Sequence, residues 1–229
     1  MNHIRHFDLE LADLKRSLVS MGNMVERSLS IAVEAIIQPT VEAREQCRVL
    51  EEQLDTLETA IEDRCHQIIA LQQPMAGELR LVIAAMRITS DLEQIGDLAE
   101  SVAKRSAFIA RNKGATIPPP IETLGRLTLG MQRHAMEAFV TGNINLARGV
   151  ITDEDHSDTL TKQCYEELQV LMRTDPDRIR EYTHLLRAAS QLEHIADVAV
   201  SIAEETVYIC KGINIRHHHE QITGEMSGE

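Results

Sequence analysis

The segment Arg87-Ile-Thr-Ser-Asp-Leu-Glu-Gln-Ile-Gly-Asp97 recurs 100 residues later as Arg187-Ala-Ala-Ser-Gln-Leu-Glu-His-Ile-Ala-Asp197. From these segments to Ile109 and Ile209, about ten of 23 aligned positions carry the same residue. Apolar residues in each copy recur in steps of three and four, which indicates an amphipathic helix. Shared apolar spacing does not explain the matched Arg, Ser, Glu and Asp residues. We therefore infer an internal repeat.

Helical spacing continues through most of the chain, and no strand-like alternation of any length competes with it. The first apolar stripe contains Phe7, Leu11, Leu14, Leu18, Met21 and Val25, and the second contains Leu50, Leu54, Leu57 and Ile61. Breaks fall at Pro39, Gln73-Pro74, Gly114 to Pro120 and Gly142-Asn143. Asp175-Pro176 predicts an N-cap followed by proline in the first turn of a sixth helix.

These patterns predict an all-α fold of two tandem antiparallel three-helix bundles. The earlier helices match at an offset near 103, as Met21-Gly22 does with Leu124-Gly125. The predicted units are a first bundle at 1–113, a proline-rich linker at 114–120, a second bundle at 121–215 and a polar tail at 216–229.

Composition narrows the class of protein. The 229 residues carry 23 basic and 36 acidic side chains, a net charge of −13, which disfavours nucleic acid as a partner. Aromatic residues make up only 3%, as suits a helical bundle with an aliphatic core. The four cysteines form no Cys-x-x-Cys pair, Asp8 and Glu10 interrupt any signal peptide, and no apolar run approaches the roughly 20 residues of a membrane span. We expect a soluble cytoplasmic protein.

The repeated carboxylates are the candidate functional residues. With Leu92 and Ile95 as core positions, the heptad pattern places the acidic side chains of the third and sixth helices on the outward face. These are Glu93, Asp97 and Glu100 in the first repeat, and Glu193, Asp197 and Glu204 in the second. A Glu and an Asp four residues apart on a helix repel each other, so the pair needs basic neighbours or a bound cation.

Two interpretations of these carboxylates remain open. Arginines on the adjacent stripe, namely Arg80, Arg87, Arg180 and Arg187, could supply part of the compensating charge on a solvated face laced with ion pairs. Alternatively a metal binds, and all-oxygen ligation then favours magnesium, manganese or iron over structural zinc. Asp55, Glu58 and Asp158 are candidates to complete its ligand shell.

The sequence resembles the PhoU family from about residue 5 to Arg216. The duplicated Leu-Glu-x-Ile-Gly/Ala-Asp segment carries the resemblance, together with Leu79-Arg80 after Gln73-Pro74 and the Met21-Gly22 and Leu124-Gly125 steps. Each motif is short, but their order and spacing together are specific.

The resemblance implies tandem three-helix bundles, often dimeric, that regulate phosphate homeostasis in the cytoplasm. Such proteins connect the ATPase of a high-affinity phosphate ABC transporter to a sensor histidine kinase and repress the phosphate-starvation response. Some bind multinuclear iron or other metal clusters through a Glu/Asp-x-x-x-Asp motif. That motif carries over onto Glu93 with Asp97 and onto Glu193 with Asp197.

This chain departs from the family pattern between the motif Glu and Ile. Many members have Arg there, whereas this chain has Gln94 and His194. The motif Gly96 becomes Ala196 in the second repeat, and Asp91 is matched by Gln191. The two repeats therefore need not bind identically.

Three functions compete: a regulatory adaptor, a metal-dependent enzyme or iron-handling protein, and a structural protein with no ligand. Glu181-x-x-His184 resembles half of a di-iron site, but the equivalent stretch of the first repeat has neither ligand. Carboxylates on a convex surface disfavour an enzyme, which needs a concave pocket. We expect a non-enzymatic regulator, a homodimer that reaches the membrane only through its partners, with the four arginines above as partner contacts.

Overall fold

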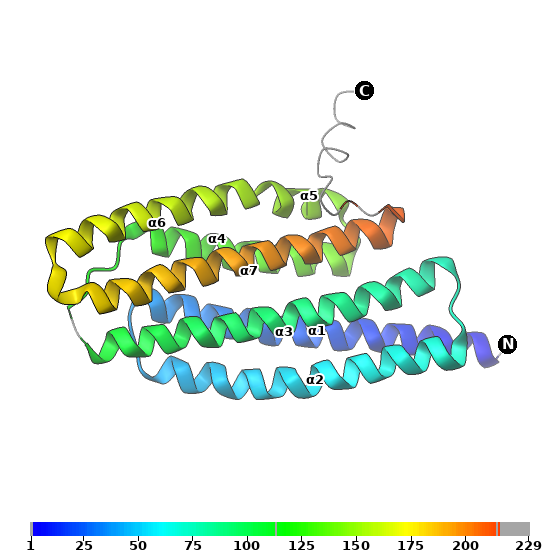
Figure 1. Cartoon of the computed structure of the whole chain (residues 1–229). Coiled ribbons are helices and arrows are strands. Elements are labelled where there is room, and N and C mark those ends of the chain that lie inside the picture. Colours follow the sequence, from blue (N-terminus) through cyan, green and yellow to red (C-terminus); the bar gives the residue numbers. More distant parts are fainter. Residues whose placement is uncertain (1, 113, 214, 216–229) are drawn as a thin grey trace, which may run out of the picture.

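The computed structural model describes residues 2–112, 114–213 and 215, with side chains from residue 7 onward. The predicted tail at 216–229 lies outside the described residues. The described residues form the helices α1 (Asn2–Ile37), α2 (Glu42–Gln72), α3 (Ala76–Arg111), α4 (Pro119–Thr141), α5 (Ile144–Thr152), α6 (Glu154–Thr174), the short 3-10 helix η1 (Pro176–Arg178) and α7 (Ile179–Lys211) (Figure 1). The all-α prediction is confirmed.

The helix boundaries differ from the sequence pattern at three places. The predicted fifth helix is interrupted at Asp153, so that it forms α5 and α6. Pro176 opens a 3-10 turn, and the long helix α7 begins only at Ile179. Helix α4 begins at Pro119, inside the predicted linker, because proline fits a first helical turn whose backbone N–H groups have no intrahelical partner.

The two repeats lie side by side and share one core. Helices α1, α2 and α3 pack together, as do α4 to α7, and the two groups meet where α3 lies against α7 and α1 against α4 (Figure 1). A single cluster of buried aliphatic side chains runs through both. None of the helices in the described part of the chain combines the length and apolar character needed to cross a bilayer.

Matched glycines bring α1 and α4 close together. A Cβ atom on Gly22 would lie 2.6 Å from Cε of Met136, and one on Gly125 would lie 3.0 Å from Cγ1 of Val33. These are the repeat-equivalent glycines of the Met-Gly and Leu-Gly steps. Their place in the fold is therefore the contact between the repeats, where a side chain would push the helices apart.

Candidate functional site: the acidic faces of the two repeats

Helix α3 presents Glu93 and Asp97 beside α2. Leu92 and Ile95 are fully buried, whereas Asp97 is exposed and Glu93 is partly buried. Between them, Gly96 permits a close approach of the two helices, since a Cβ there would lie 2.5 Å from Cδ1 of Leu54. The absence of a side chain at this position therefore brings the polar residues of α2 next to the acidic pair.

The first acidic face consists of Glu51, Asp55 and Glu58 on α2 with Glu93 and Asp97 on α3. Burial, and then the charges of Asp97, Glu58, Asp55 and Glu51, raise the pKa of Glu93 to about 7. Burial and the charge of Asp55 also raise the pKa of Asp97. Asp55 and Glu58 are thus where the sequence predicted them, next to the motif pair. Glu51 was not predicted, although its spacing from Asp55 puts both on one helix stripe.

The predicted compensation by Arg80 and Arg87 is wrong. The charged groups that shift the pKa of Glu93 are all carboxylates. Arg87 instead reaches across to α7, where its Nη1 atom lies 2.9 Å from Oε1 of the buried Glu205. Arg80 lies beside Gly212. A Cβ atom placed on Gly212 would be 3.5 Å from Cζ of Arg80. These arginines face the second repeat because their stripe forms the α3–α7 contact.

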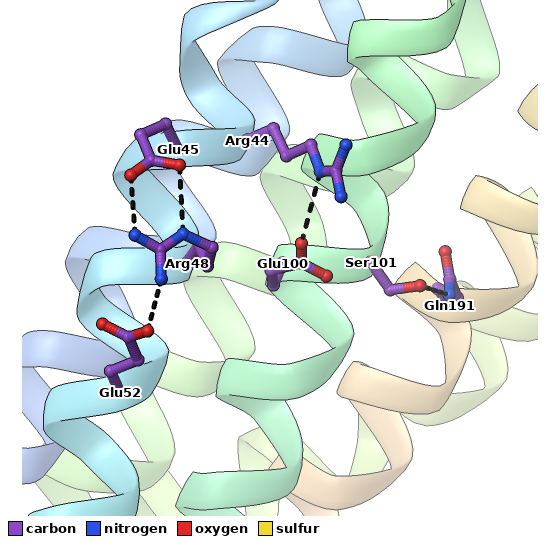
Figure 2. Close-up of polar contacts among 7 residues, drawn as sticks. All are labelled: Arg44, Glu45, Arg48, Glu52, Glu100, Ser101 and Gln191. Carbon is purple, nitrogen blue, oxygen red and sulfur yellow. Dashed lines mark hydrogen bonds and ion pairs between the residues drawn. The ribbon is translucent and has the colours of Figure 1, made fainter.

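Glu100 lies at one end of the first acidic face, in an ion pair. Its Oε1 atom is 3.8 Å from Nε of Arg44 on α2 (Figure 2). On the same helix, Arg48 lies between two glutamates, Glu45 and Glu52, and pairs with both (Figure 2). Cations are therefore present at this end of α2, whereas the charges acting on Glu93 are all negative.

The second acidic face consists of Asp158 on α6 with Glu193 and Asp197 on α7. The pKa of Glu193 is raised by burial, by Asp197 and by Asp158, while Lys162 and His194 oppose the shift. The pKa of Asp197 is raised by burial and Asp158, again against His194. The two faces therefore differ electrostatically, because nearby cations offset part of the negative charge of the second.

The outward placement of Glu204 is wrong. Its side chain is buried, at 9% exposure, and Glu205 is buried more deeply, at 2%. The C-terminal half of α7 is enclosed because α5 packs against it in addition to α3 and α4, and Cys210 reaches Gly142 in the turn between α4 and α5. The extra covering helix arises from the interruption at Asp153, which the sequence pattern did not reveal.

The donor chemistry of both faces suits hard cations, but the faces are not preformed metal cages. In the described ranges, no three His, Cys, Asp or Glu side chains are arranged so as to hold a metal ion. Magnesium, by contrast, usually keeps several waters and binds through one or two carboxylates. Paired carboxylates on adjacent helices can meet that lower requirement.

Fold and site together define a helical tandem-repeat protein with an acidic pair on the last long helix of each repeat, α3 and α7. The sequence model of the PhoU domain matches this chain twice, at residues 18–106 and 121–206. These matches cover most of both repeats, and the chain belongs to the PhoU family.

Relatives and solved structures match over nearly the full chain. Two relatives called phosphate-specific transport system accessory protein PhoU homolog are 32% identical over 219 residues (Pseudomonas aeruginosa; 94% of this chain and 90% of the relative) and 33% identical over 216 residues (Aquifex aeolicus; 94% and 98%). The crystal structure of PhoU from P. aeruginosa has a TM-score of 0.88 at 31% identity, covering 90% of this chain and all of that one. A regulatory PhoU protein of the phosphate transport system from Streptococcus pneumoniae has a TM-score of 0.83 at 28% identity, covering 91% and 98%.

Proposed function

We propose that this chain is a non-enzymatic accessory protein of a phosphate-specific transport system. In this role it contacts the ATPase subunit of the phosphate ABC transporter and a sensor histidine kinase, in the cytoplasm, and represses phosphate uptake and the phosphate-starvation response. The observation that carries the proposal is the match of the PhoU domain to both repeats. It is supported by relatives that are named as transport accessory proteins and that this chain matches over at least 90% of their length.

The surface chemistry supports a binding role. The two acidic faces lie on the outside of the bundles and are suited to basic patches on a partner, for which charge complementarity sets the encounter rate and the specificity. Arg180 and Arg187 are exposed and remain proposed partner contacts. Arg87 keeps some exposure beside its ion pair with Glu205, and we retain it and Arg80 as secondary contacts.

The enzyme alternative receives less support from the geometry. A depression of about 900 Å³ lies between α1 and α2, and its lining includes Glu26, Arg27, Glu45 and Gln53. None of the paired motif carboxylates lines it. Binding energy at a convex acidic face is available to a partner protein or a hydrated cation, whereas an enzyme substrate needs to be enclosed.

We also propose that the first acidic face binds a divalent cation of the magnesium, manganese or iron class. Such an ion would relieve the mutual repulsion of the five carboxylates. Manganese added at pH 8 is therefore expected to raise the melting temperature of the wild type more than that of a Glu93→Gln, Asp97→Asn variant. An equal rise in both proteins would contradict cation binding at this face.

The regulatory role is tested by deleting the gene in its natural host. Phosphate-scavenging genes are expected to be expressed in phosphate-rich medium after the deletion, and to be repressed again by the wild-type gene supplied in trans. Capture of the tagged protein from phosphate-replete cells is expected to recover the transporter ATPase and the kinase. Unchanged expression together with recovery of neither partner would contradict the proposal. Light scattering of the purified chain tests the proposed homodimer.

A further inference from the structure

The contact between α3 and α7 pairs equivalent positions of the two repeats in opposite directions. Position 87 meets position 205, where Arg87 and Glu205 form an ion pair at 2.9 Å. The equivalent contact at the other end joins positions 187 and 105. Position 105 carries Arg where the second repeat carries Glu. One end of the contact is therefore neutralised, whereas the other opposes Arg187 with Arg105.

Arg105 and Arg187 hold two positive charges near each other at this end. Arg105 donates from Nε to the neutral amide oxygen of Gln191, at 3.0 Å. Burial and the charge of Arg187 lower the pKa of Arg105, as expected for two cations held near each other. In the part of the chain that the structure describes, neither Arg180 nor Arg187 forms an ion pair with a carboxylate. Three arginines and one carboxylate, that of Glu181, therefore act together on His184 at this end.

His184 lies among these cations. Its ring stacks on Phe108 with centroids 3.9 Å apart, and Cζ of Arg180 is 5.6 Å from the centroid of Phe108. Nδ1 of His184 is buried and has no hydrogen-bond partner among the described residues. Burial and three arginine charges lower the pKa of the ring, while the buried Glu181 opposes them. A neutral imidazole has one N–H donor and one acceptor nitrogen, and it adds no charge of its own to this end.

A cavity opens at this point. Its volume is about 280 Å³, and it is lined by Ile179, Arg180, Thr183, His184 and Arg187. Cavities that enclose larger organic ligands start at about 300 Å³, so this one suits a small ion or one phosphate group. The lining presents two guanidinium groups, an imidazole and a hydroxyl. Guanidinium groups bind phosphate oxygens in a bidentate manner, and hydroxyl groups add further donors.

We infer that the α3–α7 contact binds a phosphate group in the cavity beside His184, held by Arg180 and Arg187, with Arg105 completing the positive field. The group is either free inorganic phosphate or the phosphoryl group of a small ester. The site is separate from the acidic faces and does not depend on the proposed regulatory role. The bound dianion would occupy the place that Glu205 fills at the opposite end of the contact.

The test measures the binding of sodium phosphate to the full chain by calorimetry and by the shift in melting temperature. Sodium chloride at matched ionic strength is the control for screening. Arg187→Gln is expected to weaken phosphate binding about tenfold or more. The control variant Arg126→Gln removes an equal charge from α4, where Arg126 pairs with Glu122, and is expected to bind like the wild type. Glycerol 3-phosphate, compared with inorganic phosphate, separates an ester from the free ion.

A second variant gives a signature that folding defects cannot imitate. Arg105→Glu installs opposite Arg187 the charge that Glu205 presents to Arg87. It is expected to raise the melting temperature in chloride while abolishing the further rise caused by phosphate. Two results would overturn the inference: a phosphate effect no larger than that of chloride in the wild type, or equal phosphate binding by wild type, Arg187→Gln and Arg105→Glu.

Discussion

Replacement of Glu93 by glutamine is expected to stabilise the protein at pH 8 and not at pH 5. Glu93 has a pKa of about 7 in the folded state, against an ordinary value of 4.5. The folded state holds the proton of Glu93 more tightly than the unfolded state does. Protonated Glu93 therefore stabilises the folded state fully below pH 4.5, and this stabilisation is lost as the pH rises through 7. At pH 8 the ionised Glu93 therefore destabilises the folded state, whereas glutamine keeps the shape and hydrogen-bonding capacity of the protonated acid.

The size of the effect follows from the pKa. The difference between about 7 and 4.5 corresponds to at most about 3 kcal/mol, at 1.36 kcal/mol per pKa unit. Glu93 is only partly buried, and screening by solvent reduces this to about 1–2 kcal/mol. For a chain of this length, the melting temperature should rise by about 2–8 °C.

The assay is thermal unfolding followed by circular dichroism at pH 5 and pH 8 without divalent ions. Glu166→Gln is the matched control, because Glu166 is an exposed glutamate on α6 outside both acidic faces, and it should change stability by less than about 0.5 kcal/mol. A lower melting temperature of Glu93→Gln at pH 8, or an equal shift at both pH values, would show that ionised Glu93 does not destabilise the folded state.

Three further predictions test the packing around the site. Arg87→Ala should lower the free energy of unfolding by about 3 kcal/mol, because it removes the cation paired with the buried Glu205. Arg87→Lys should restore part of the lost stability. A loss below about 0.5 kcal/mol for Arg87→Ala in urea denaturation would contradict this prediction. Gly96→Ala should destabilise the protein by about 1 kcal/mol, because crowding of Leu54 outweighs the gain in helix propensity. Gly149→Ala should stabilise it by about 0.5–1 kcal/mol, because the space around Gly149 is open. Similar urea midpoints for the two variants would be evidence against the close α2–α3 contact. A thiol reagent should modify only Cys210 rapidly in the native protein, since Cys47, Cys65 and Cys164 are buried and burial raises the pKa of their thiols; rapid reaction of a second cysteine would contradict the described core.

The helical class and the order of helices could be predicted because apolar spacing is a local property of the chain. The same spacing correctly placed Asp97 and Asp197 on the surface, and it identified Asp55 and Glu58 as neighbours of the first motif pair. It failed for Glu204, because a single helix pattern does not reveal that α5 also covers the end of α7.

Contacts between the two repeats could not be predicted from the sequence either. Arg87 was predicted to compensate the acidic face, yet its partner is Glu205, 118 positions later in the chain. The opposition of Arg105 and Arg187 has the same origin. Both depend on which stripe of α3 lies against α7, and that is set by the packing of the two bundles rather than by either helix alone.

In the proposed role, the acidic faces would form the surface through which this chain binds the phosphate transporter. The most direct test of this role is the affinity of the purified chain for the transporter ATPase subunit, measured at two salt concentrations. Binding is expected to weaken with salt, and to fall about tenfold or more when Glu93, Asp97, Glu193 and Asp197 are replaced by their amides. Equal affinity of the wild type and this folded variant would contradict this expectation.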